Sequence, residues 1–229
     1  MKLLLTSSGI SNPSIEDALV ELLGKPISES SALIVPTAIY PFREGPGGAW
    51  RAISGKTESP FSGLGWKSLG VLELTALPSI REESWVPLVR ETDALLVWGG
   101  HVMYLCYWMR QSELADLLPS LSDLVYVGVS AGSIVMTPYN GDVEFNLQTI
   151  PEGSDVAREG DRALGLVDFT VRVHVDREGF ESMADVERWA AGIPVPTYAI
   201  DDETAIRVID GSPEVVSEGN WKLFTPPSP

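Results

Sequence analysis

Short apolar runs alternate with segments of helical character along the first half of the chain. Five of these runs are expected to be strands, at residues 2–5, 32–35, 71–74, 94–98 and 124–127. Between the first two, Asn12 can cap a helix that has Pro13 in its first turn and Gly24 after its last. This alternation predicts an α/β fold, with a mainly parallel sheet covered by helices on both faces.

The remaining connections are less regular. Residues 42–65 are rich in Gly, Pro and Ser, which predicts a long loop with a short helix, and residues 137–162 show little periodicity. We expect a strand at 169–173, a helix at 180–191, a strand pair at 197–200 and 204–209, and a turn at Asp210-Gly211. Residues 1–229 are expected to form a single domain, with 225–229 as a disordered tail.

Composition and charge narrow the possible partners. The chain is 44% hydrophobic and 21% charged, as in ordinary soluble proteins, and its net charge of −16 repels phosphate backbones and anionic lipids. We therefore expect neither nucleic acid nor a membrane as a partner. The apolar run at residues 2–5 is too short for a signal peptide, and no run approaches the ~18 apolar residues of a membrane span, so we expect a cytoplasmic protein.

The single cysteine, Cys106, excludes an intrachain disulfide and a multi-cysteine zinc site. It lies among aromatic residues in a segment of helical character, so we expect a buried and inert thiol.

The motif Gly128-Val-Ser-Ala-Gly132 follows the apolar run at 124–127 and leads into a helix-compatible segment. A strand that ends in G-x-S-x-G and turns sharply into a helix exposes one serine hydroxyl at the end of a sheet. Ser130 is therefore a candidate nucleophile, although a turn with small residues for packing would have the same sequence.

A serine nucleophile needs a base, and the chain has two histidines. His174 follows the predicted strand at 169–173, as a base at a strand end would. His101 follows Gly99-Gly100, where free backbone N–H groups can bind an oxyanion, so we assign that role to Gly100 and Ala131, with His101 lining the pocket. The acid that orients the base is expected among Asp201, Asp202 and Glu203.

These motifs, in this order over nearly the whole chain, resemble the S51 serine peptidases, which comprise peptidase E (aspartyl dipeptidase) and the cyanophycinases. The resemblance rests on the opening residues 1–5, residues 34–38, Gly99-Gly100, Gly128-Val-Ser-Ala-Gly132, the strand before His174 and residues 200–205. It implies a fold similar to class I glutamine amidotransferases, with Ser130 as nucleophile and His174 as base. The third member, a glutamate in peptidase E, falls on Asp202, with Asp201 and Glu203 as alternatives.

The departures from peptidase E concern the substrate. His101 stands where peptidase E usually has asparagine, and residues 181–187 carry acids where the family has arginines suited to an N-terminal aspartate. Asp142 and Glu144 lie roughly where the family binds the free α-amine of its substrate. We therefore expect His101 to line the substrate pocket and Asp142 or Glu144 to bind the amine, although a solvated acidic loop would have the same sequence. The departures from the family argue against strict Asp-X specificity.

Together these features predict a serine exopeptidase that cleaves dipeptides or short peptides through an acyl-enzyme, as a monomer or homodimer, without a metal or cofactor. Two alternatives remain open at this point: an ester or amide hydrolase acting on small non-peptide substrates with the same triad, and a catalytically silent binding module of the same fold.

Overall fold

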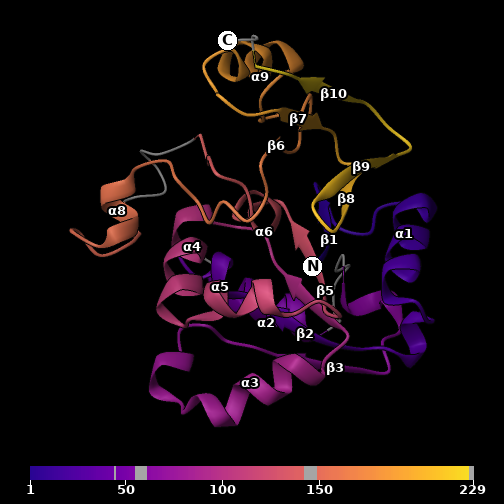
Figure 1. Cartoon of the computed structure of the whole chain (residues 1–229), viewed down its shortest axis with the longest axis vertical. Coiled ribbons are helices and arrows are strands. Elements are labelled where there is room, and N and C mark those ends of the chain that lie inside the picture. The colour runs from indigo at the N-terminus through magenta and orange to yellow at the C-terminus, as the bar shows by residue number, and fades with distance from the viewer. Residues whose placement is uncertain (44, 55–60, 142–148, 227–229) are drawn as a thin grey trace.

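A computed structural model describes residues 1–43, 45–54, 61–141 and 149–226 (Figure 1). The strands are β1 (Lys2–Thr6), β2 (Ser31–Val35), β3 (Ser68–Val71), β4 (Ala94–Val97), β5 (Val125–Val129), β6 (Thr170–Arg172), β7 (Thr197–Ile200), β8 (Thr204–Ile209), β9 (Ser212–Ser217) and β10 (Trp221–Phe224). The α-helices are α1 (Pro13–Leu23), α2 (Gly45–Ser54), α3 (Glu82–Glu91), α4 (Val102–Gln111), α5 (Leu114–Leu117), α6 (Ala131–Ile134), α8 (Asp155–Glu159) and α9 (Met183–Ala190).

The larger sheet has seven strands in the order β3-β2-β4-β5-β1-β8-β9. The first five are parallel to one another, and β8 and β9 extend the sheet in antiparallel fashion. Helix α1 lies along one side of this sheet, and α3, α4 and α5 lie along the other (Figure 1). The predicted α/β class, with a mainly parallel sheet and helices on both faces, is confirmed.

Alternate residues of the central strands supply two cores. Leu3 and Leu5 of β1 belong to the cluster that includes α3 and α4, whereas Leu4 packs with Ile15 and Leu19 of α1. Because both faces of a parallel sheet are covered, its strands are apolar along their whole length rather than at every second residue. This explains why short continuous apolar runs mark the central strands in the sequence.

Helix α1 has the caps that its sequence predicts. The Asn12 side chain accepts a hydrogen bond from the backbone N–H of Ile15 at 3.0 Å, and Pro13 occupies the first turn. Gly24 adopts a left-handed conformation, φ 69°, and its N–H donates to the Val20 carbonyl. The segment that leads into α1 runs from the end of β1, next to the candidate nucleophile.

A second sheet has three strands in the order β10-β7-β6 and, with α9, lies at one end of the molecule (Figure 1). The expected pairing of residues 197–200 with 204–209 is therefore wrong. Both segments are strands, but β7 pairs with β6 and β10, whereas β8 pairs with β1 and β9. The three acids at 201–203 form the connection between the two sheets, where the Asp201 side chain accepts a hydrogen bond from the hydroxyl of Thr204.

Two other boundaries follow from burial and turn geometry. The expected strand at 71–74 is displaced, because β3 ends at Val71 and the apolar Leu72 and Leu74 are buried beyond the end of the strand pairing. Asp210 and Gly211 both have positive φ and form the two-residue turn between β8 and β9, as predicted. The 42–65 connection contains α2, and residues 227–229 of the expected tail lie outside the described residues.

Within the described part of the chain, no helix combines the length and apolar character that crossing a membrane requires.

Candidate active site

Ser130 occupies the sharp turn between strand β5 and helix α6. Its backbone angles, φ 51° and ψ −113°, are rare for a residue with a side chain. Such a conformation costs on the order of 1–3 kcal/mol and persists where the surrounding structure enforces it. The Ser130 N–H donates to the carbonyl oxygens of Thr6 and Ser7, each at 3.1 Å, so the end of β1 holds the turn in place.

The two glycines of the motif are required by close backbone contacts. A Cβ atom on Gly132 would lie 2.2 Å from the carbonyl oxygen of Val97 in β4. A Cβ atom on Gly128 would lie 2.5 Å from the carbonyl oxygen of Gly132. Helix α6 can therefore begin directly against the sheet only because these positions lack side chains.

His174 follows strand β6 and is buried, with a left-handed φ of 57°. Its backbone N–H donates to the Ser7 hydroxyl at 2.8 Å, and its ring Nδ1 lies 2.5 Å from Oδ1 of Asp202. Because an ionised carboxylate can only accept hydrogen bonds, Nδ1 carries the proton in this pair. The other ring nitrogen, Nε2, is then the one that can accept a proton from a nucleophile.

Of the three adjacent acids, Asp202 is the one that contacts His174. Asp201 instead stabilises its own turn, where Oδ1 accepts hydrogen bonds from the Thr204 hydroxyl at 2.7 Å and from the Glu203 N–H at 3.1 Å. The Glu203 carboxylate accepts a hydrogen bond from the side-chain amide of Asn12 at 3.1 Å. The structure thus brings together Ser130, His174 and Asp202 at the carboxyl ends of the central strands β1 and β5.

Hydrogen bonds keep the Asp202 carboxylate ionised. Burial by itself raises the pKa of this carboxyl, but hydrogen bonds from His174, Ser7 and Ser8 outweigh it and lower the pKa below its ordinary value. In addition, Nη1 of Arg177 lies 3.1 Å from Oδ2 of Asp202. A carboxylate that remains charged can orient the imidazole and stabilise its protonated form.

Two backbone N–H groups are available beside Ser130. No described residue accepts a hydrogen bond from the N–H of Gly100 or of Ala131, the first residue of α6. Gly100 has φ 142°, and a Cβ atom there would lie 2.2 Å from the Ala38 carbonyl oxygen. A Cβ atom on Gly99 would lie 3.1 Å from Cβ of Ser130, so the glycine turn runs directly against the candidate nucleophile.

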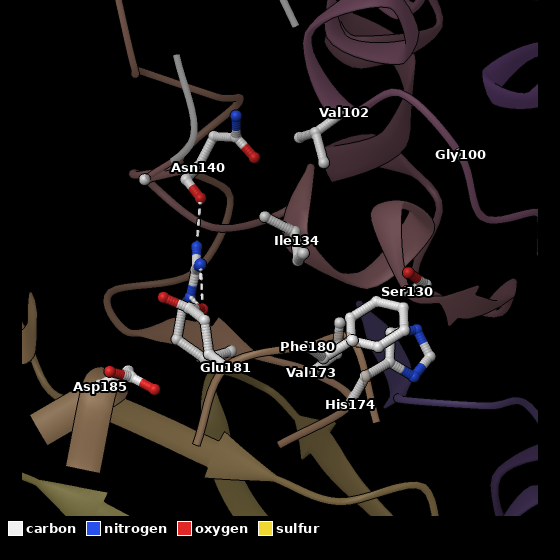
Figure 2. A pocket seen from close by; sticks show the side chains of 13 residues that line it. Gly100, Val102, Ser130, Ile134, Asn140, Val173, His174, Phe180, Glu181 and Asp185 are labelled. Atoms are coloured by element: carbon white, nitrogen blue, oxygen red, sulfur yellow. Dashed lines mark hydrogen bonds and ion pairs between the residues drawn. The ribbon is translucent and has the colours of Figure 1, made fainter. Parts of the chain in front are cut away.

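A pocket of about 670 Å³ opens in front of Ser130 and His174 (Figure 2). Its volume is within the range of about 300–1,000 Å³ typical of small-molecule sites. The remaining lining residues are Gly100, Val102, Ile134, Asn140, Gly141, Arg172, Val173, Gly179, Phe180, Glu181 and Asp185. The Phe180 ring packs against the His174 ring, with 4.7 Å between the ring centroids.

Arg172, Glu181 and Asp185, three charged side chains that line this pocket, already have hydrogen-bond partners within the chain. The Arg172 guanidinium donates through Nε and Nη2 to Glu181, donates to the Asn140 carbonyl at 2.6 Å, and lies over the Trp189 ring. Asp185 accepts hydrogen bonds from Ser182 at the start of α9. Arg172 is the one Lys or Arg among the described residues that line the pocket, and each of its three guanidinium nitrogens already donates a hydrogen bond.

The predicted substrate-binding residues lie elsewhere or outside the described residues. His101 is buried at the start of α4, where its ring packs against Phe42 at 4.5 Å, and the pocket wall beside it is formed by Gly100 and Val102. The described residues that line the pocket do not include His101. Asp142 and Glu144 lie outside the described residues.

Neither Ser7 nor Arg172 belongs to a motif that marks it as part of the site. Ser7 follows β1, whose carboxyl end lies beside that of β5, so its nearness to Ser130 depends on strand order. Arg172 is the last residue of β6 and stands two positions before His174, and this nearness along the chain is the one signal in the sequence that could have found it.

Two further expectations concern thiols and metals. Burial raises the pKa of the Cys106 thiol to about 11, and its side chain is fully buried in the core. Among the described residues, no group of three or more His, Cys, Asp or Glu side chains is arranged to hold a metal ion.

The sequence model of peptidase family S51 matches residues 3–216 of this chain. The chain belongs to peptidase family S51. This S51 member is therefore a serine peptidase, as the sequence predicts. A comparison with curated protein sequences gives no match.

Solved structures share the fold of this S51 chain. A candidate peptidase E from Listeria monocytogenes EGD-e is 19% identical, with a TM-score of 0.63 over 95% of this chain and 98% of that one. A peptidase from an acI-B1 Actinobacterium is 17% identical, with a TM-score of 0.68 over 99% of this chain and 95% of that one. At these identities the likeness shows a common fold.

Proposed function

We propose that this S51 peptidase is an exopeptidase that hydrolyses dipeptides or short peptides through an acyl-enzyme on Ser130, without strict Asp-X specificity. His174 is the base, Asp202 orients it, and the N–H groups of Gly100 and Ala131 form the oxyanion hole.

In this mechanism the Ser130 Oγ attacks the scissile carbonyl carbon while Nε2 of His174 takes the hydroxyl proton. The carbonyl oxygen becomes an oxyanion and accepts hydrogen bonds from Gly100 and Ala131. The intermediate collapses when the C–N bond breaks and His174 donates its proton to the leaving amine. In the second half, His174 takes a proton from a water molecule that attacks the acyl-serine ester. The ester C–O bond then breaks, His174 returns the proton to the Ser130 oxygen, and the acid is released.

The observation that carries the proposal is the hydrogen bond of 2.5 Å between His174 and Asp202, with His174 and Ser130 on the wall of one pocket. A lowered pKa of Asp202 supports its assignment as the orienting acid, because the carboxylate stays charged when the imidazole gains a proton. The positive φ of Ser130 supports its assignment as the nucleophile, because strain of this kind gathers at functional sites.

The charges of the pocket support a substrate other than strictly Asp-X. A substrate carboxylate bound by Arg172 would compete with Glu181, which already accepts hydrogen bonds from two of the three guanidinium nitrogens. A pocket of about 670 Å³ has room for a short peptide, and its paired charges leave a surface without strong preference for an acidic side chain.

The test is hydrolysis of a dipeptide library by the wild type, Ser130→Ala and His174→Ala, with product amines quantified by mass spectrometry. We expect several non-Asp dipeptides to be cleaved by the wild type and kcat/KM to fall by about 10³-fold or more in each variant. Cleavage of Asp-X substrates alone would overturn the specificity, and variants as active as the wild type would overturn the triad.

Covalent labelling separates the acyl-enzyme from other routes. A fluorophosphonate should add one phosphonyl group to the wild type and none to Ser130→Ala, with near-ultraviolet circular dichroism to show that both are folded. A panel of simple esters measured beside the peptides tests the alternative of a non-peptide hydrolase, which requires esters to be turned over and peptides to be left intact.

A further inference from the structure

We infer that Ser7 is a positioning residue for the reaction: its buried hydroxyl joins the backbone of the base to the carboxylate that orients it. The inference rests on the proposed function of Ser130, His174 and Asp202.

The Ser7 side chain makes three contacts within this group. Its hydroxyl donates to Oδ1 of Asp202 at 2.8 Å, accepts from the backbone N–H of His174 at 2.8 Å, and lies 3.2 Å from Nδ1 of the same histidine. Ser7 is fully buried, so these bonds do not compete with bulk water.

The proton count of the hydroxyl fixes its role. A serine hydroxyl has one proton, and since the His174 N–H can only donate, that proton goes to the Asp202 carboxylate. The carboxylate oxygen that receives it is the same Oδ1 that receives Nδ1–H of His174. Ser7 thus fixes the oxygen on which the orientation of the imidazole depends.

The backbone contact adds a second constraint. His174 has a left-handed φ of 57°, a conformation that a residue with a side chain adopts at a cost. The hydrogen bond from its N–H to Ser7 stabilises that conformation, and the carbonyl of Ser7 also accepts a hydrogen bond from the Ser130 N–H at 3.1 Å. One residue at the end of β1 therefore contacts the backbones of both the nucleophile and the base.

Ser7 is absent from the residues that line the described pocket, so its loss should leave substrate binding nearly intact. For Ser7→Ala we expect kcat to fall by about 10- to 100-fold with KM changed less than about threefold, the effect of a lost hydrogen bond to a charged group. The acid limb of the pH dependence of kcat/KM should move to higher pH, because Asp202 with one donor fewer holds a proton on the neighbouring imidazole more strongly.

Two variants separate positioning from plain stability. Ser133 in α6 has an equally buried hydroxyl beside the carboxyl end of β1, and it donates to the Thr6 carbonyl at 2.7 Å. Ser133→Ala should lower thermal stability about as much as Ser7→Ala but leave the acid limb where it is in the wild type. Ser7→Thr keeps the hydroxyl and should recover most of kcat together with the wild-type acid limb.

If Ser7→Ala is not recovered folded, Ser7→Cys takes its place, because a thiol has a similar shape and is a poor donor. An unchanged acid limb and kcat in the folded variant would overturn the inference, and so would the same change in Ser133→Ala. If Ser130→Ala and His174→Ala retain full activity, the proposed function itself is wrong, so the two failures are distinguishable.

Discussion

Replacement of Gly132 by alanine tests whether the turn at Ser130 depends on contact between helix α6 and strand β4. The new Cβ would lie 2.2 Å from the Val97 carbonyl oxygen, about 1.2 Å closer than the 3.4 Å at which ordinary contact begins. The obstacle is backbone in a central strand, so no flexible side chain can move aside to relieve it.

Overpacking of this kind costs about 1–3 kcal/mol, and an overlap with backbone belongs at the upper end, at about 3 kcal/mol. In a chain of 229 residues this lowers Tm by about 6–12 °C. We also expect slower fluorophosphonate labelling of Ser130, because α6 must move away from β4 and carry the Ser130 turn with it.

The assay is differential scanning calorimetry together with the rate of labelling. Gly63→Ala is the matched control, because a Cβ atom at Gly63 has no heavy atom within 4 Å. Its Tm should stay within about 2 °C of the wild-type value or rise slightly, since alanine restricts the unfolded chain. A Gly132→Ala variant with wild-type Tm and labelling rate would refute the argument.

Three further predictions concern the orienting acid and the cysteine. Asp202→Asn should lower kcat/KM for a dipeptide by about 10³-fold or more, while Glu203→Gln should change it by less than about twofold; equal losses would contradict the assignment. The folded-state pKa of Asp202 lies below its ordinary value of 3.8, so its contribution to stability is complete above pH 3.8 and is lost as pH falls through the lowered pKa. Urea denaturation of wild type and Asp202→Asn should give a difference in unfolding free energy that is largest near pH 6 and shrinks below pH 3.8, and a difference that grows toward low pH would contradict this sign. Cys106 should react with a thiol reagent at pH 8 only after denaturation, because burial raises its pKa to about 11; rapid labelling of the folded chain would contradict its burial.

The sequence predicts those features that depend on neighbours along the chain. The caps of α1, the strand-turn-helix around Ser130 and the two-residue turn at Asp210-Gly211 each involve residues within a few positions of one another. Local sequence also places His174 after a strand, because residues 169–173 alternate between apolar and polar side chains.

Features that depend on how distant segments meet could not be predicted in the same way. Residues 201–203 are all acidic, and their different partners follow from the connection between two sheets, which no periodicity reveals. Strands β7 and β8 belong to different sheets, and the apolar sequence of each strand does not indicate with which strands it pairs. The expected strand at 71–74 is misplaced because apolar residues are not always strand residues: Leu72 and Leu74 are buried in the core although β3 ends at Val71.

Strand β1 lies between β5 and β8 in the larger sheet, so its two pairings join segments that are far apart in the sequence. The neighbours of this central strand are separated from it by about 120 and 200 residues of chain. Ser130 is already in place in the sequence before the orienting acid at 202 has been added. Under the proposed function, a growing polypeptide therefore contains its nucleophile before its base and its orienting acid, and the triad is incomplete until residue 202 has been added.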